Sequence, residues 1–276
     1  MLNLREIHKP TTVEEALKLL QQPGTVAMAG GTELLARARR DVEAVVDLSA
    51  LGLSYIRESS GAIAIGATTT LAALAESPIL RAMANGVIAQ AAHRSAGSVL
   101  RNQGTVVGTL ITEPDGILAV VLLALDAQVT IRRNGLTTTA FADFLSTPES
   151  LLNNALVTEI RLPMANPRAS LQTVARTPSD KPIVSACVAA QILRSAQNDT
   201  VARDVRIALG GVGEAAMRAS APEKALEGQS PNDPTIENAA HLAREGLSPR
   251  GDFRGSVEYR KEMAVVLTRR AVKELA

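Results

Sequence analysis

The stretch Thr25-Val26-Ala27-Met28-Ala29-Gly30-Gly31-Thr32-Glu33-Leu34 decides the N-terminal fold, because a short apolar run passes through a glycine pair into a helix-forming segment. Residues 33–40 have helix-forming composition, and the basic residues near their end complement a helix dipole. The sequence therefore predicts a strand, a glycine turn and a helix, in that order.

A glycine pair between a strand and a helix is suited to binding an anion. Without a Cβ the backbone N–H groups can approach closely, and the N-terminus of the helix adds partial positive charge. The pair Gly30-Gly31 matches neither the dinucleotide fingerprint GxGxxG nor the nucleoside-triphosphate loop GxxxxGK[ST]. Phosphate binding and a purely structural corner both stay open as interpretations of this turn.

The rest of the N-terminal half alternates between helix and strand. Thr12 and Glu15 form a capping box that predicts an early helix, and helical segments are expected from about residue 71 to residue 93. Hairpins are predicted over residues 55–66 and over residues 128–139. This alternation favours mixed α/β layers over a helical bundle or a β-sandwich.

The second half has a different pattern, and we place a domain boundary near Pro167. A second glycine segment, residues 104–111, precedes that boundary and is predicted to be strand-like. A final helix is expected to begin at Ser256. Three long strands are predicted after the boundary: residues 171–176, 183–193 and 201–209. The apolar face predicted for the final helix consists of Tyr259, Met263, Val266, Leu267, Ala271 and Leu275.

Composition excludes several classes of function. The formal net charge is +1, from 29 Lys and Arg against 28 Asp and Glu, so no excess charge attracts nucleic acid or an anionic membrane. The longest apolar run, residues 117–125, is about half of the roughly 20 residues that a spanning helix requires. No signal peptide is visible at the N-terminus, so we expect a cytoplasmic protein. The single cysteine, Cys187, cannot form an internal disulfide or hold an iron–sulfur cluster.

Three segments carry a resemblance to a known family. They are Ala29-Gly30-Gly31-Thr32-Glu33-Leu34, Ile65-Gly66-Ala67-Thr68-Thr69 and Arg101-Asn102-Gln103-Gly104-Thr105-Val106-Val107-Gly108. Their order and spacing resemble the FAD-binding medium subunit of molybdenum hydroxylases, the family of xanthine dehydrogenase and carbon monoxide dehydrogenase. The resemblance continues through Ile207-Ala208-Leu209-Gly210-Gly211-Val212-Gly213 and Gly251-Asp252-Phe253-Arg254-Gly255-Ser256 to the end of the chain.

The resemblance implies an α+β fold. Residues 1–167 would form a two-lobed FAD-binding α/β domain of the PCMH type, with lobes at about residues 1–53 and 54–167. Residues 168–276 would form a C-terminal flavoprotein domain of a three-stranded antiparallel sheet and helices.

The resemblance also implies a set of FAD-binding residues and no catalytic or metal-ligating residue in this chain. The implied FAD-binding residues are Ala29, Gly30, Gly31, Thr32, Glu33, Leu34, Thr105, Val106, Val107, Gly108, Thr109, Asp115, Val157 and Gln172. Two of these positions depart from the family pattern in the second loop, where the family usually has two adjacent glycines followed by Asn and this chain has Val107-Gly108-Thr109. Asp115 comes slightly early, and Gln172 replaces a Lys that could stabilise a reduced, anionic flavin.

The implied function is that of an oxidoreductase subunit, distinct from the subunit that hydroxylates the substrate. It would carry one non-covalent FAD and pass electrons from the [2Fe-2S] clusters of an iron–sulfur small subunit to an external acceptor. A molybdopterin large subunit would hold the molybdenum cofactor, and the complex would be a dimer of heterotrimers. A scaffold subunit that has lost FAD is the alternative, motivated by Val107, Thr109 and Gln172. A self-contained flavin enzyme would need acid–base residues of its own beside the ring, and no convincing set is present.

Overall fold

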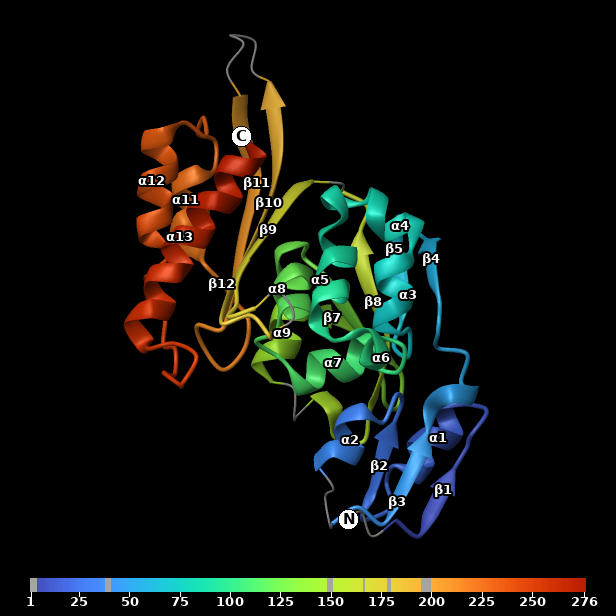
Figure 1. Cartoon of the computed structure of the whole chain (residues 1–276). Helices are drawn as coiled ribbons and strands as arrows, with labels where there is room; N and C mark the ends of the chain where they lie inside the picture. The colour runs from blue at the N-terminus through green and yellow to red at the C-terminus, as the bar shows by residue number, and fades with distance from the viewer. Residues whose placement is uncertain (1–3, 38–40, 148–150, 166, 178–179, 195–199) are drawn as a thin grey trace.

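The structure is a computed structural model that describes residues 4–37, 41–147, 151–165, 167–177, 180–194 and 200–276. It has an N-terminal lobe, a central lobe and a C-terminal domain, each built around its own sheet (Figure 1). Helices and sheets are combined in all three parts, so the predicted α+β class is confirmed.

The N-terminal lobe is a small parallel sheet whose successive strands are connected by helices. Its strands are β1 (Glu6–His8), β2 (Thr25–Met28) and β3 (Ala44–Asp47), in the order β1-β3-β2. Its helices are α1 (Val13–Leu19), α2 (Thr32–Arg37) and the 3-10 turn η1 (Leu48–Ala50). Thr12 caps α1 by accepting a hydrogen bond from the N–H of Glu15 at 3.2 Å, as the capping box predicts. The strand, turn and helix predicted around Gly30-Gly31 are confirmed as β2 and α2, and residues 38–40 of the predicted helix lie outside the described residues.

The central lobe is an antiparallel sheet of five strands, covered by helices. The strands are β4 (Ile56–Ser59), β5 (Ala62–Gly66), β8 (Leu156–Pro163), β6 (Gln128–Arg132) and β7 (Leu136–Ala140), in that spatial order. The helices are α3 (Leu71–Glu76), α4 (Pro78–Ala82), η2 (Ala84–Gly86), α5 (Val87–Ser95), α6 (Ser98–Arg101), α7 (Val106–Thr112), α8 (Ile117–Ala124) and α9 (Phe141–Ser146). Both predicted hairpins are confirmed, as the antiparallel pairs β4·β5 and β6·β7.

The second glycine segment is helical, so the prediction of a strand there is wrong. Residues 106–112 form α7, and the short helix α6 precedes it instead of an apolar strand. The run of Thr and Val residues suggested a strand because β-branched side chains favour extended backbone. Thr105 caps α7, because its hydroxyl accepts a hydrogen bond from the N–H of Gly108 at 3.3 Å.

The C-terminal domain is an antiparallel sheet with helices packed on one side. Its strands are β9 (Arg168–Val174), β10 (Val184–Arg194), β11 (Thr200–Gly210) and β12 (Met217–Arg218), in the order β12-β11-β10-β9. Its helices are α11 (Ser220–Leu226), α12 (Asp233–Leu242) and α13 (Val257–Leu275). The sheet has four strands and not the expected three, because the two residues of β12 pair with the edge of β11.

The central lobe and the C-terminal domain share one hydrophobic core through α8. Every residue of α8 is buried, and the helix packs against α5 on one side and against β10 and β11 on the other. Asp126, just after α8, forms ion pairs with Arg206 and Arg218 of the C-terminal sheet. The C-terminal domain is therefore attached firmly to the central lobe. The central lobe lies between this domain and the N-terminal lobe (Figure 1).

Among the described residues no single helix has both the length and the apolar character to cross a membrane. The helices α7 and α8 meet that requirement only when taken together, with a bend of 105° between them.

Candidate functional site

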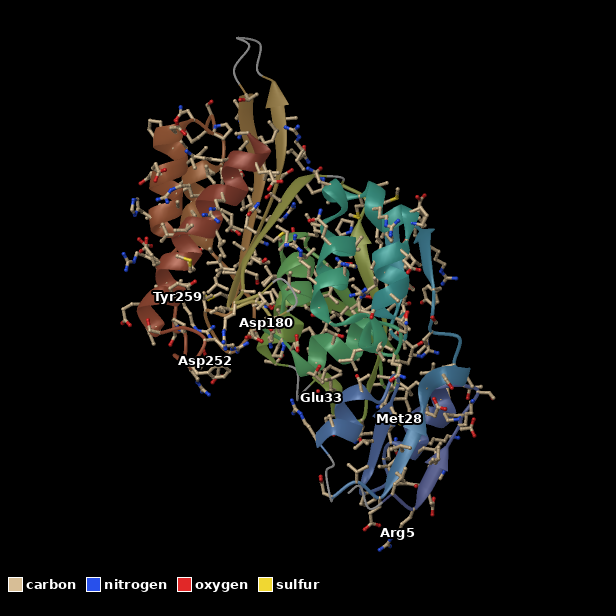
Figure 2. All side chains as sticks on the ribbon, viewed as in Figure 1. Arg5, Met28, Glu33, Asp180, Asp252 and Tyr259 are labelled. Atoms are coloured by element: carbon tan, nitrogen blue, oxygen red, sulfur yellow. The ribbon has the colours of Figure 1, made fainter. Side chains whose placement is uncertain are left out.

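A long cleft separates the N-terminal lobe from the central lobe. It consists of two adjacent hollows of about 490 Å³ and about 560 Å³. The residues that line both hollows are Ala27, Ala29, Thr105, Gly108 and Ile111. Figure 2 shows Glu33 at the edge of the N-terminal lobe that faces the central lobe. Volumes in this range are typical of sites for organic ligands and cofactors.

The first glycine loop supplies unpaired hydrogen-bond donors to this cleft. Ala29, Gly30, Gly31, Thr32, Glu33 and Leu34 all line the hollow of about 490 Å³. Within the described residues, no group accepts a hydrogen bond from the backbone N–H of residues 30–34. Gly31 has φ +68°, a left-handed conformation that favours glycine, and it directs the chain into α2. Several N–H groups at one turn, free of internal partners, are an arrangement that binds anions.

Gly30 is required for a close contact between the two loops. A Cβ at this position would lie 1.8 Å from the carbonyl oxygen of Gln103 and 2.7 Å from its carbonyl carbon. The first loop thus rests directly on the backbone that leads into α7. The glycine serves loop packing here, which is a different reason from the close approach to an anion that the sequence suggested.

The second loop forms the opposite wall, and its backbone N–H groups from Val106 to Thr109 are already paired. The N–H groups of Val106 and Val107 donate to the carbonyl oxygens of Thr69 and Ala67 at 2.9 and 3.4 Å. The N–H groups of Gly108 and Thr109 both donate to Thr105, at 3.3 Å to its hydroxyl and at 2.9 Å to its carbonyl oxygen. This loop therefore contributes side-chain hydroxyl groups and packing surface to the cleft, whereas the first loop contributes unpaired backbone N–H groups.

The two departures in the second loop have different surroundings. Val107 is 9% exposed, packs in the core of the central lobe and lines the hollow of about 560 Å³. Thr109 lines the hollow of about 490 Å³ and is only partly buried. The branched side chain of Val107 thus occupies space that a glycine would leave to the cleft.

A group of charged side chains lies at and just beyond the end of the cleft nearest to the C-terminal domain. Lys181, from the segment between β9 and β10, places its Nζ 3.8 Å from Oε2 of Glu113 and 3.4 Å from Oδ1 of Asp115. Glu33 forms an ion pair with Arg37 within α2. Burial raises the pKa of Glu113, the negative charges of Asp115 and Glu33 raise it further, and Lys181 opposes them.

Most of the residues implied for FAD binding come together at the cleft, and three do not line it. Val157 of β8 lines the hollow of about 560 Å³. Val106 is fully buried behind the second loop. Asp115 faces Lys181 in a small neighbouring hollow. Gln172 lies on β9, where its amide nitrogen donates to Oε2 of Glu274 on α13 at 2.6 Å, and it lines a separate cavity of about 600 Å³.

Sequence reasoning missed several residues of the cleft. The segment 152–156, which leads into β8, lines the hollow of about 560 Å³, and so do Ala67 and Thr68. Ser95, Ala96 and Leu100 line the other hollow. Thr68 and Ala67 belong to the second motif of the family resemblance, so that motif could have identified them. The segment 152–156 carries no motif, and its position follows only from the pairing of β8 in the central sheet.

The comparisons with known proteins cover the whole chain. Residues 3–165 match the family described as the FAD binding domain in molybdopterin dehydrogenase, and residues 169–275 match the carbon monoxide dehydrogenase flavoprotein C-terminal domain. This chain belongs to that flavoprotein family. It is an FAD-binding medium subunit of the molybdenum hydroxylase type, distinct from the subunit that carries the molybdenum site.

Relatives and solved structures agree with this assignment. The glyceraldehyde dehydrogenase medium chain of Sulfolobus acidocaldarius is 29% identical, and the match covers 96% of both chains. Subunit alpha of the 6-hydroxypseudooxynicotine dehydrogenase complex of Paenarthrobacter nicotinovorans is 32% identical over 95% of this chain and 90% of its own. A chain of the carbon monoxide dehydrogenase of Hydrogenophaga pseudoflava superposes with a TM-score of 0.87, at 28% identity, over 98% of this chain and 96% of its own.

The residues of the cleft fit the cofactor of this family. A diphosphate requires hydrogen-bond donors, and the N–H groups of residues 30–34 are free within the described residues. Flat ring systems require apolar walls, and both hollows present more apolar than polar surface. Among the described residues no cluster of His, Cys, Asp and Glu could hold a metal ion.

Proposed function

We propose that this chain is the electron-transfer flavoprotein of a molybdenum-containing hydroxylase or dehydrogenase. The observation that carries the proposal is the row of unpaired N–H groups at residues 30–34, which faces the second loop across a cleft of the right size in a chain of this family. FAD, when bound, exchanges one or two electrons, so it can connect one-electron carriers with two-electron acceptors. The chain's own residues hold and orient the cofactor.

The residues proposed to hold FAD divide between the two sides of the cleft. The N–H groups of residues 30–34 would bind the diphosphate from the N-terminal lobe, and Gly31 sets the backbone path that exposes them. The hydroxyl groups of Thr105 and Thr109 would contact the cofactor from the central lobe. Val157 and Val107 would pack against it in the other hollow. We do not include Val106, Asp115 and Gln172 among the direct contacts, because they do not line the cleft.

The proposed partners are an iron–sulfur small subunit and a molybdopterin large subunit, assembled with this chain as a dimer of heterotrimers in the cytoplasm. Four of the relatives are medium chains or medium subunits by name, which supports a complex of several subunits. The single cysteine of this chain supports the placement of the iron–sulfur clusters on another subunit.

The experiment is an anaerobic reduction of the purified complex followed by visible spectroscopy. Electrons supplied through the partner subunits should bleach the flavin absorption, and an added acceptor should restore it. Removal of FAD from this chain should leave the reduction of the partner's clusters intact while transfer to the acceptor stops. Transfer to the acceptor that continues at the original rate without FAD would contradict the proposal.

A scaffold subunit without FAD is the second candidate, and the second loop favours it. Val107 fills part of the cleft, and all four N–H groups from Val106 to Thr109 are paired within the protein. If this candidate is right, the double change Val107→Gly, Thr109→Asn should confer FAD binding on a chain that otherwise lacks it. Native FAD at one per chain would exclude it.

A further inference from the structure

Glu113 occupies a position shared by the cleft and the C-terminal domain. It is the residue at which α7 ends, and it lines both the hollow of about 490 Å³ and the small hollow next to it. The small hollow is closed from the other side by Lys181 and Pro182 of the C-terminal domain. Figure 2 shows the neighbouring Asp180 at the junction between that domain and the central lobe. The carboxyl group of Glu113 thus lies where the cleft meets the C-terminal domain.

Glu113 shares its ion-pair partner with a second carboxylate. Lys181 is shared between two carboxylates, and its Nζ lies nearer to Asp115, at 3.4 Å, than to Glu113, at 3.8 Å. Glu33 approaches from the first loop, and its charge is opposed by Arg37 in its own helix.

Arg94 is a second cation of this region, and within the described residues it forms no ion pair with Glu113. Arg94 of α5 lines the small hollow, but the side chain is exposed and directs Nη1 toward the hydroxyl of Thr173 at 3.4 Å. Among the described residues, Glu113 therefore has Lys181 as its ion-pair partner, and it shares that partner with Asp115.

The surroundings of Glu113 favour its protonated form. Burial removes water from its charged form, and the negative charges of Asp115 and Glu33 act in the same direction, so its pKa is raised in spite of Lys181. In the proposed site, the doubly negative diphosphate of FAD would lie at the first loop, beside Glu33. That added negative charge disfavours the ionised form of Glu113 further.

We propose that Glu113 takes up a proton from solvent when FAD binds, so that the loaded cleft contains a neutral carboxylic acid next to the cofactor. This inference rests on the proposed FAD site and adds a coupling between cofactor binding and pH. No bond other than that to the proton is formed or broken.

The coupling has a defined sign. The pKa of Glu113 is higher with FAD bound than without it, so FAD binds most tightly at pH values below the pKa of the free protein. Between the two pKa values the Kd rises with pH, by up to about tenfold per pH unit for one proton. Above the pKa of the loaded protein the Kd is constant again, because Glu113 is ionised in both states.

The test measures the Kd for FAD as a function of pH, by quenching of flavin fluorescence, on the full chain together with the subunits that copurify with it. Wild type should show the rise in Kd described above. Glu113→Gln should remove it, because the amide does not titrate. Glu262→Gln is the matched control, since Glu262 is an exposed carboxylate on α13 far from the cleft, and this variant should keep the wild-type curve.

Two further variants test whether the neighbouring charges set the pKa of Glu113, because they should shift the pH at which the Kd rises in opposite directions. Lys181→Met removes the opposing cation and should move the rise to higher pH. Asp115→Asn removes a repelling charge and leaves Lys181 to Glu113, so it should move the rise to lower pH. A merely structural role for these residues would not produce opposite shifts.

The inference is overturned if the Kd of wild type does not change with pH, or if Glu113→Gln keeps the wild-type dependence. Either result leaves FAD binding and electron transfer intact as the function. If wild type binds no FAD at any pH, the proposed function and this inference both fail.

Discussion

Replacing Gly30 by Ala tests the close contact between the two loops of the cleft. The added Cβ would lie 1.8 Å from the carbonyl oxygen of Gln103, whereas an ordinary contact begins at 3.4 Å. The first loop must therefore move away from Gln103 by about 1.6 Å. The obstacle is backbone and not a flexible side chain, so the loop as a whole has to shift.

The expected effect follows from that displacement. Overpacking of this kind costs typically about 1–3 kcal/mol. If the loop moves to relieve the strain, the N–H groups of residues 30–34 leave their positions. The cost of overpacking then appears as weaker binding of FAD. The Kd should then rise by roughly tenfold to a hundredfold, since about 1.4 kcal/mol corresponds to a factor of ten.

The assay is a fluorescence titration with FAD, accompanied by urea unfolding to detect any loss of stability. Gly97→Ala is the matched control, because Gly97 lies at the start of α6 near the same cleft with nothing within 4 Å of an added Cβ. It should bind FAD as wild type does. A Gly30→Ala variant with wild-type affinity and stability would refute the close approach of the two loops.

Three further predictions concern stability and reactivity. Burial raises the pKa of the Cys187 thiol to about 12, so a thiol reagent should label it only after unfolding, and rapid labelling of the folded chain would contradict the packing of β10. Arg260 is 5% exposed and its Nη1 donates to the carbonyl oxygens of Ile183 and Gly211 at 2.7 and 2.9 Å; Arg260→Met should reduce the free energy of unfolding by about 3 kcal/mol in urea titrations. Val107→Gly should cost about 2–4 kcal/mol in the same assay, because it empties a core position in a helix, and an unchanged midpoint would place that side chain outside the core.

The parts of the fold that local chemistry determines were predictable from sequence. The capping box at Thr12 and Glu15 starts α1, and Ser256 caps α13 by accepting a hydrogen bond from the N–H of Tyr259 at 3.1 Å. Both hairpins follow from turn residues between alternating strands. In each case the signal and the structure lie within a few residues of each other.

The parts that depend on distant contacts were not predictable. The segment at residues 104–111 has the composition of a strand, yet its N–H groups at Val106 and Val107 pair with carbonyl oxygens of the segment after β5, and α7 forms. The predicted apolar face of α13 is wrong at Tyr259, which is 37% exposed, whereas Arg260 is buried. An arginine faces the core there because strand ends of the C-terminal sheet offer it carbonyl oxygens, which no periodicity in the sequence reveals.

In the candidate site, too, residues within local motifs were predictable, and residues placed by distant contacts were not. The two glycine loops were identified from their motifs, and the structure brings them to opposite walls of one cleft. The segment 152–156 was not identified, because only the path of the chain into β8 takes it there. Asp115 and Gln172 were carried over by resemblance, but each is engaged with a charged partner outside the cleft, Lys181 and Glu274 respectively.

The most direct test of the account is the amount of FAD released per chain from the purified protein, alone and together with its copurifying subunits. We predict a yellow protein with one FAD per chain in the complex, with less FAD per chain in the Gly30→Ala variant and the wild-type amount in Gly97→Ala. A colourless wild-type protein in both preparations that takes up no added FAD would contradict the account, and it would assign the chain to the scaffold role.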